Sequence, residues 1–158
     1  MQDIPIAYIN GSCANNEQLD QRKRRGLSVA TDPTGSLLAK KVTLGGSNNI
    51  AEFTALLLAL EWARESGHRT LAIKTNCQTI RSWEKGIFGK KLCDRDTVMK
   101  LYRDIEKLRE EVSFTLDQIP RAENVAASYV DSHYGLMYQT YLDNVFGIAA
   151  AEQEIVGA

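Results

Sequence analysis

The sequence predicts one α/β domain in which helices flank a mixed sheet that begins with antiparallel strands. The first observation is that β-prone runs open the chain, with a tight-turn sequence between two of them. The second is a long run with apolar residues at helical spacing, followed by further strands and helices in alternation. Strands and helices in this order pack as a sheet with helices on it.

A hairpin accounts for the antiparallel start of the sheet. Residues 4–12 are mostly apolar and β-prone, which is typical of a buried strand. Residues 26–31 and 36–44 are two further β-prone runs, and the sequence Asp-Pro-Thr-Gly at 32–35 suits a tight turn. Because so short a connection returns the chain beside itself, we expect these two strands to pair antiparallel.

A helix is expected directly after the hairpin. Residues 47–49 supply capping side chains, apolar residues recur at helical spacing through 50–66, and Gly67 follows as a stop. The elements expected next are a strand at 69–75, a short helix at 77–85, a basic loop at 86–94, a helix at 96–111, a strand at 113–120 and a helix from near Asn124.

Composition excludes several classes of protein. The 158 residues suffice for one substantial core and are too few for two ordinary domains, so residues 1–158 are expected to form a single domain. Lys and Arg number 19 and Asp and Glu number 20, so the chain is neither disordered nor polycationic. Nucleic-acid binding would therefore need a local basic patch.

The cysteines and the apolar runs indicate in which cellular compartment the protein is expected. Cys13, Cys77 and Cys93 form no CxxC pair, so neither a disulfide framework nor a zinc knuckle is indicated. Residues 1–9 lack the pattern of a signal peptide, and no later apolar run approaches the length of a membrane span. We therefore expect a soluble, cytoplasmic protein without a membrane partner.

Four short motifs stand where the expected strands and helices meet. Nucleases that use two metal ions place several carboxylates at such positions, because cations roughly 3.5–4 Å apart must be neutralised. Taken singly, an Asn-Gly after a strand is more often a turn, and an Asn before a helix is more often a cap. The motifs are INGSC at 9–13, NNIAE at 48–52, TNCQ at 75–78 and IPRAENVAAS at 119–128.

In this order the four motifs resemble those of the type 1 ribonuclease H family, over roughly residues 4–131. The resemblance implies a ribonuclease H-like fold, with a five-stranded mixed sheet whose first three strands are antiparallel and whose later strands are parallel. It also implies cleavage of RNA/DNA hybrids with Mg²⁺ or Mn²⁺. The family's metal-ligand carboxylates match the positions of Asn10, Glu52, Asn76 and Ser128.

Only Glu52 is acidic among these four positions. Asn offers a neutral carbonyl oxygen, and Ser a hydroxyl, where Asp offers a full charge. At a ligand distance of roughly 2 Å, each lost charge removes on the order of 8 kcal/mol of attraction at an effective dielectric of about 20. We therefore expect Glu52 to bind metal weakly or not at all, and the chain to be inactive as a nuclease. Asp131 is placed either to reach this site or to serve as surface charge.

Polar residues that match the family's substrate contacts remain. In the family such residues contact the minor groove of a hybrid, so binding of RNA/DNA hybrid or RNA is expected to outlive cleavage; the same residues also suit ordinary turns and caps. A basic run ahead of the second strand suits a phosphate contact or a solvated loop. The candidate contacts are Cys13, Asn16, Asn48, Asn49 and Gln78, and the basic run is Arg22, Lys23, Arg24 and Arg25.

The last helix is expected to continue as a C-terminal helical extension over about residues 132–153. Tyr134, Met137, Tyr141 and Val145 follow it at helical spacing and give it a wide apolar surface. Such a surface packs either on the sheet of its own chain or on a second copy, so a homodimer is one expectation.

Three hypotheses on function fit these observations. The leading one is a catalytically inactive ribonuclease H-like protein that binds nucleic acid or a protein partner. The second is an RNA/DNA-hybrid ribonuclease, a two-metal endonuclease, in which Asn10, Asn76 and Ser128 were introduced by engineering to trap a substrate complex. The third is a non-enzymatic assembly protein that dimerises through its C-terminal helix.

Overall fold

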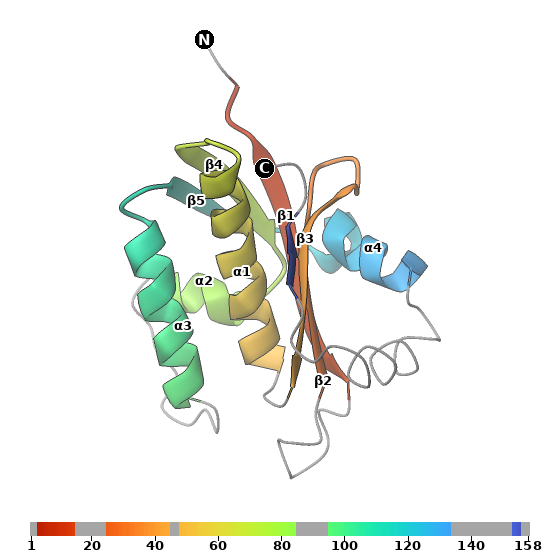
Figure 1. Cartoon of the computed structure of the whole chain (residues 1–158). Helices are drawn as coiled ribbons and strands as arrows, with labels where there is room; N and C mark the ends of the chain where they lie inside the picture. Colours follow the sequence, from red (N-terminus) through yellow and green to blue (C-terminus); the bar gives the residue numbers. More distant parts are fainter. Residues whose placement is uncertain (1–2, 15–24, 45–47, 85–94, 134–152, 156–158) are drawn as a thin grey trace.

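The computed structural model describes residues 3–14, 25–44, 48–84, 95–133 and 153–155 (Figure 1). Within these stretches strands and helices follow one another in the order expected from the sequence. The elements are β1 (Ile6–Ala14), β2 (Arg25–Thr31), β3 (Leu37–Leu44), α1 (Asn48–Glu65), β4 (Thr70–Thr75), α2 (Gln78–Glu84), α3 (Arg95–Leu108), β5 (Ser113–Gln118), the short 3-10 helix η2 (Arg121–Glu123), α4 (Val125–His133) and β6 (Gln153–Ile155).

The strands form one mixed sheet in the order β5-β4-β1-β2-β3-β6. β1 pairs antiparallel with β2, and β2 pairs antiparallel with β3. β4 runs parallel to β1 on its other side, and β5 runs parallel to β4. The fold class expected from the sequence, a five-stranded mixed sheet flanked by helices, is therefore confirmed. The short strand β6 was not expected; it pairs antiparallel with β3 and extends that side of the sheet.

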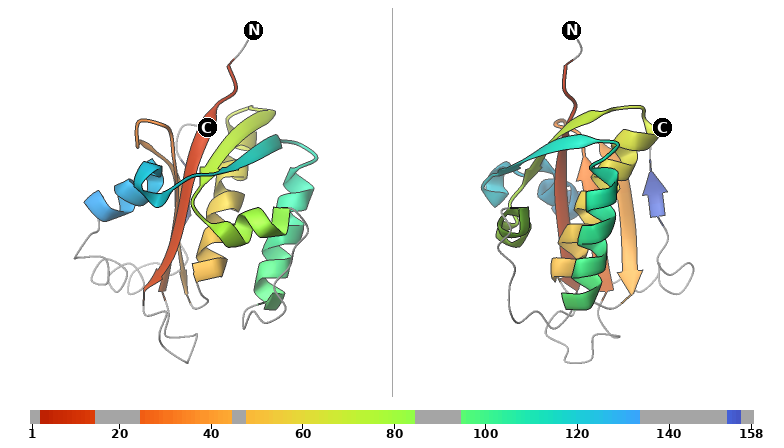
Figure 2. Two further views of the ribbon diagram at one scale, coloured as in Figure 1. Left: turned by 180° about the vertical axis from the view of Figure 1, so that it is seen from behind. Right: turned by 90° about the vertical axis from the view of Figure 1, so that its left-hand side faces the viewer.

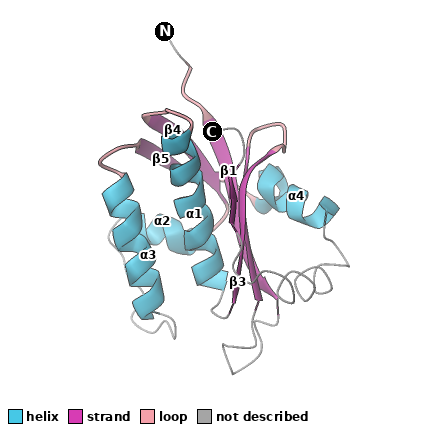
Figure 3. Cartoon of the chain, viewed as in Figure 1, coloured by secondary structure: helices cyan, strands magenta, loops and turns pink. Residues whose placement is uncertain are grey.

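Helices cover both faces of the sheet. α1 and α3 lie together on one face, and α4 lies on the other, as the edge-on view and the two turned views show (Figures 1 and 2). α1 contacts β1, β2 and β3, whereas α4 contacts β1 and β2. Figure 3 separates the two kinds of element by colour. β1 and β2 are thus contacted by helices of both layers.

The main core lies between α1 and the sheet. Alternate residues of β1 and β4 point into it, and α1 contributes a broad buried face. Its largest fully buried side chains include Ile9, Phe53, Leu58, Leu60, Leu71, Ile73, Ile80 and Ile105. On the opposite face, α4 buries Ala126, Ala127 and Val130. Two-sided packing of this kind explains the near-continuous apolar composition of the central strands.

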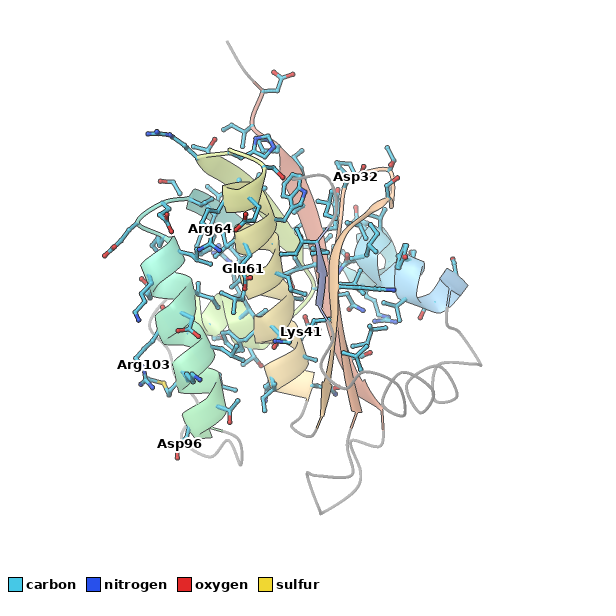
Figure 4. All side chains as sticks on the ribbon, in the orientation of Figure 1. Asp32, Lys41, Glu61, Arg64, Asp96 and Arg103 are labelled. Carbon is cyan, nitrogen blue, oxygen red and sulfur yellow. The ribbon has the colours of Figure 1, made fainter. Side chains whose placement is uncertain are left out.

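The turn between β2 and β3 forms as expected. Asp32, labelled in Figure 4, accepts hydrogen bonds at Oδ1 from the backbone N–H groups of Thr34 (2.9 Å) and Ser36 (3.0 Å). Burial alone would raise the pKa of this carboxyl, but the hydrogen bonds from Thr34, Ser36 and Gly35 outweigh it and lower the pKa. Gly35 has φ of 89°, a left-handed conformation that disfavours other residues. The Asp-Pro-Thr-Gly sequence therefore encodes the hairpin.

α1 ends in the glycine stop that the sequence predicts. Gly67 has φ of 81°, its N–H donates to the carbonyl of Arg64 (3.1 Å), and the N–H of His68 donates to that of Ala63 (2.8 Å). These two bonds form a Schellman motif, which satisfies carbonyls that the helix leaves open. Arg64 projects from this end beside α3 (Figure 4) and lies 3.8 Å from Glu111. The link joins α1 to the turn that follows α3.

Several element ends differ from the expectation. α1 begins at Asn48, so Asn48 and Asn49 lie in the first helical turn and do not precede it. β5 ends at Gln118, although the N–H of Ile119 still donates to Thr75 (2.8 Å); Pro120, which has no N–H, then ends the pairing. The expected basic loop at 86–94 lies outside the described residues.

The C-terminal helical extension remains a prediction over most of its length. α4 extends to His133, residues 134–152 lie outside the described residues, and Gln153 begins β6. A single domain over residues 1–158 likewise remains an expectation. Among the helices in the described stretches, none has the length and apolar content needed to cross a bilayer.

Candidate functional site

The site is built where β1 passes the first turn of α1. Gly11 makes this approach possible, because a Cβ at this position would overlap the carbonyl group of Ala51 and come within 2.5 Å of the Glu52 nitrogen. The hydroxyl of Ser28, on β2, donates to the Ala51 carbonyl oxygen at 2.6 Å in a buried setting. These two contacts fix the start of α1 against the sheet and thereby place Glu52.

Glu52 is a buried carboxyl group. Its side chain is 9% exposed, and it accepts a hydrogen bond from the backbone N–H of Gly11. Its Oε2 atom is buried without a hydrogen-bond partner in the described part of the chain. Burial raises the pKa of Glu52 to about 8, and the Gly11 hydrogen bond and the positive charge of Arg121 only partly oppose it. At neutral pH the carboxyl is therefore mostly protonated and uncharged.

Asn124 joins the strands of the site to α4. It is fully buried, and its Nδ2 donates to the carbonyl of Ile9 (2.9 Å) and to Oδ1 of Asn76 (2.7 Å). Its Oδ1 accepts from the backbone N–H of Ala126 (3.0 Å), which makes Asn124 the N-cap of α4. One amide group thus joins the middle of β1 and the residue after β4 to the start of a helix.

Asn76 and Cys77 follow the end of β4. Asn76 is half-buried, and the backbone N–H of Cys77 donates to the Thr75 hydroxyl at 3.0 Å. Burial and the nearby Glu52 raise the pKa of the Cys77 thiol to about 11. Cys77 therefore remains a neutral thiol at neutral pH, without the thiolate character of a nucleophile.

The hydrogen bonds of Gly11 and Asn124 link the surroundings of Asn10, Glu52 and Asn76 around β1. Asn10, 3% exposed, adjoins the Gly11 N–H that binds Glu52, while Asn76 is tied to neighbouring Ile9 through Asn124. Ser128 lies one turn into α4, where its backbone N–H donates to the Asn124 carbonyl at 3.1 Å, and its side chain is exposed. Residues far apart in the sequence therefore contribute to one polar site.

The candidate substrate contacts are placed less completely. Asn48 is exposed and Asn49 half-buried in the first turn of α1, and Gln78 is exposed at the start of α2. Cys13 and Arg25 lie in β1 and β2 respectively. The remaining candidates, Asn16, Arg22, Lys23 and Arg24, lie outside the described residues.

Asp131 pairs with a cation near the site. Its carboxylate lies 3.4 Å from the guanidinium of Arg121, and both side chains are exposed. Arg121 also acts electrostatically on Glu52, so it is close to the site. Of the two alternatives for Asp131, a group that reaches the site or a surface charge, the structure favours the second, because Asp131 forms an exposed ion pair at the edge of the site. Such pairs contribute little stability.

The residues present do not fit a pair of divalent metal ions. Within the described stretches, no group of three or more His, Cys, Asp or Glu side chains is arranged to hold a metal ion. Of the four positions, Glu52 alone can carry a negative charge, and Arg121 adds a positive one nearby. Two dications need several carboxylates to offset their charge, so this donor set favours neutral or anionic ligands.

Sequence reasoning missed the role of Asn124. The residue was noted only as part of a motif, yet it makes the hydrogen bonds that organise the site. An Asn directly before a helix is a recognisable N-cap signal, but its other two partners are 115 and 48 residues away in the chain. No local pattern reports contacts over such separations.

Comparison with known proteins gives the same picture of the fold. A family model described as "Reverse transcriptase-like" matches residues 26–133. The chain is similar to the ribonuclease H1 of the halophilic archaeon Halobacterium salinarum NRC-1, with 21% identity, a TM-score of 0.60, and coverage of 80% of this chain and 92% of that one.

Two further solved structures share the fold. The N-terminal ribonuclease H domain of a Mycobacterium tuberculosis protein, solved as a fusion with maltose-binding protein, has 20% identity and a TM-score of 0.57, with 78% and 93% coverage. LC11-RNase H1, solved in complex with an RNA/DNA hybrid, has 24% identity and a TM-score of 0.56, with 78% and 90% coverage.

Proposed function

This chain belongs to the reverse transcriptase-like family and has the ribonuclease H-like fold, and from this premise we propose that it binds nucleic acid of the RNA/DNA hybrid or RNA class without cleaving it. The observation that carries the proposal is the makeup of the central site. Asn10, Asn76 and Ser128 stand with Glu52 where the family's carboxylates are expected. The scaffold is kept while the charge needed for two metal ions is absent.

Loss of cleavage follows from electrostatics. In the two-metal mechanism, the attack of water on a phosphodiester depends on metal ions that activate the nucleophile and stabilise the developing charge. Glu52 is buried, and its pKa of about 8 leaves it mostly neutral. Even when it is ionised, Glu52 is a single carboxylate among three uncharged neighbours, which provides little attraction for a pair of ions.

Binding has independent support. A neutral site does not repel the phosphate backbone as a cluster of carboxylates without metal would. Asn48, Asn49 and Gln78 remain as polar groups on the first turns of α1 and α2. The similar LC11-RNase H1 was solved with an RNA/DNA hybrid, which makes this duplex the first ligand to test.

Cleavage tests the first half of the proposal. A labelled hybrid is incubated with Mg²⁺ or Mn²⁺ and either this chain or a form carrying Asn10→Asp, Asn76→Asp and Ser128→Asp. We expect cleavage only by the restored form, and none when Glu52→Gln is added to it as a control. Cleavage by the unaltered chain at a rate like that of the restored form would contradict the proposal.

Equilibrium binding tests the second half. Hybrid, RNA duplex and DNA duplex of one sequence are titrated with the chain at low and moderate salt. If the chain contacts phosphates, log Kd should increase linearly with the logarithm of the salt concentration. If none of the duplexes binds at either salt concentration, nucleic-acid binding is wrong, and a protein partner becomes the better hypothesis.

A further inference from the structure

The orientation of the Asn76 amide is fixed by its neighbour. Asn124 Oδ1 accepts from the backbone of α4, so its Nδ2 must face Ile9 and Asn76, and Nδ2 can only donate. Asn76 therefore presents its oxygen to Asn124. Its own NH₂ group therefore faces away from the Asn124 side chain. The site thus contains an oriented pair of N–H donors where the family has a carboxylate.

One buried group near Asn76 lacks a partner. Oε2 of Glu52 is buried and unpaired among the described residues, and the side chain of Asn10, on the neighbouring strand, is 3% exposed. Buried polar groups in native proteins are normally satisfied by protein, water or a ligand. The exposed hydroxyl of Ser128 adds a further donor on α4. A buried oxygen without a partner, close to amide and hydroxyl groups that can still donate, indicates that a polar ligand completes the site.

The charge and donor set select the class of ligand. Amide N–H and hydroxyl groups bind anionic oxygens, as does the guanidinium of Arg121 at the edge of the site. Asp in place of Asn or Ser would present only acceptors, which approach a phosphate only through a bridging cation. Replacement of three acids by two amides and a hydroxyl therefore changes the ligand that the site prefers from a cation to an anion.

We propose that this site binds a phosphate group of the nucleic-acid backbone directly, through Asn10, Asn76, Ser128 and Arg121, and that no metal ion takes part. The inference rests on the proposed function, because it assigns the part of the ligand that the central site contacts. It adds that affinity is independent of Mg²⁺, which the proposed function alone does not require.

The test is the affinity for a short, fluorescently labelled RNA/DNA hybrid in EDTA and in Mg²⁺ at matched ionic strength. For the unaltered chain we expect Kd values that agree within about twofold. The form carrying Asn10→Asp, Asn76→Asp and Ser128→Asp should bind at least about tenfold more tightly with Mg²⁺ than in EDTA. Affinity of the unaltered chain that requires Mg²⁺ overturns the inference and leaves the proposed function standing. Absence of binding in both buffers overturns both.

A single substitution tests the donor pair itself. Asn76→Asp keeps an oxygen for Asn124 and so preserves the fold, but it removes both N–H groups and adds charge. Binding in EDTA should weaken by about tenfold or more. The matched control is Gln153→Glu, the same amide-to-acid change in β6, four strand spacings or roughly 19 Å from β4. The inference is overturned if Asn76→Asp binds in EDTA as tightly as the control.

Discussion

Asn124 and Asn76 face each other across the ends of α4 and β4, with 2.7 Å between Nδ2 of the first and Oδ1 of the second. The same nitrogen also reaches the carbonyl of Ile9 at 2.9 Å, so three elements meet at one buried amide. The loss of any one of these hydrogen bonds would leave a buried polar group unsatisfied. The arrangement gives Asn124 a structural importance that its position before a short helix does not indicate.

Replacement of Asn124 should destabilise the whole domain. Asn124→Ala removes the cap of α4, one buried hydrogen bond and one part-buried hydrogen bond, and we expect a loss of about 2–4 kcal/mol in the free energy of unfolding. Asn124→Asp keeps the cap acceptor but removes the Nδ2 donors, so it separates the two effects. Urea unfolding followed by circular dichroism measures both variants. A loss for Asn124→Ala no larger than that of an ordinary surface cap would show that the inter-element bonds are unimportant.

The protonation of Glu52 makes stability depend on pH. Its pKa is about 8 in the folded chain and 4.5 when exposed, so folding favours the protonated form. The contribution of Glu52 to the free energy of unfolding is therefore most favourable below pH 4.5. It becomes less favourable as the pH rises from 4.5 through 8, because over that range Glu52 ionises in the unfolded chain but stays protonated in the folded one. Glu52→Gln should remove this dependence and stabilise the chain at pH 8 by a few kcal/mol at most.

Urea unfolding between pH 5 and pH 9 measures this effect. The control is Glu65→Gln, at an exposed position of the same helix. If the unaltered chain and Glu52→Gln show parallel pH profiles, Glu52 is ionised in the folded state, and the account of a neutral site is wrong.

Gly11 should tolerate no side chain. A methyl group at this position would overlap the Ala51 carbonyl, and the overlap can be relieved only by moving α1 away from β1. We expect Gly11→Ala to cost about 3 kcal/mol or more, at the upper end of overpacking effects. Gly35→Ala is the comparison, since it meets no neighbouring atom and should cost only about 1–2 kcal/mol for its left-handed backbone. Equal losses in thermal unfolding would contradict the close approach of α1 and β1.

Arg121 should contribute to nucleic-acid binding through charge alone. Its side chain is exposed, and its pairing with Asp131 is a surface ion pair, so Arg121→Gln should leave stability nearly unchanged. Hybrid affinity should fall, and the slope of log Kd against log salt should decrease by about one, as for the loss of one phosphate contact. Arg64→Gln, at the far end of α1, serves as the control. An unchanged slope for Arg121→Gln would exclude this contact.

Local sequence signals predicted most of the fold. The turn residues Asp32 and Gly35 located the hairpin, and Gly67 marked the end of α1, because each acts through bonds within a few residues. Helical spacing and β-prone runs placed the remaining main elements for the same reason. β6 was not predicted, since three residues carry too little periodicity to indicate a strand.

The candidate site was predicted in position but not in state. The motifs placed Glu52 near the start of a helix and Asn76 directly after a strand, where the structure has them, whereas Asn10, expected at the end of a strand, lies in the middle of β1. The raised pKa of Glu52 arises from burial by elements distant in the sequence, and the fixed amide of Asn76 arises from Asn124. Both properties depend on tertiary packing, so the sequence alone carries no direct signal for them.

β6 also affects how this chain meets other chains. A sheet whose outer strand is unpaired offers backbone donors and acceptors to any passing extended peptide, and this is a common start of aggregation. β6 occupies those groups along part of β3, beside Ala39, Lys40 and Lys41. Removal of residues 153–158 should therefore expose a template for intermolecular strand pairing, and light scattering at elevated concentration would reveal the resulting loss of colloidal stability.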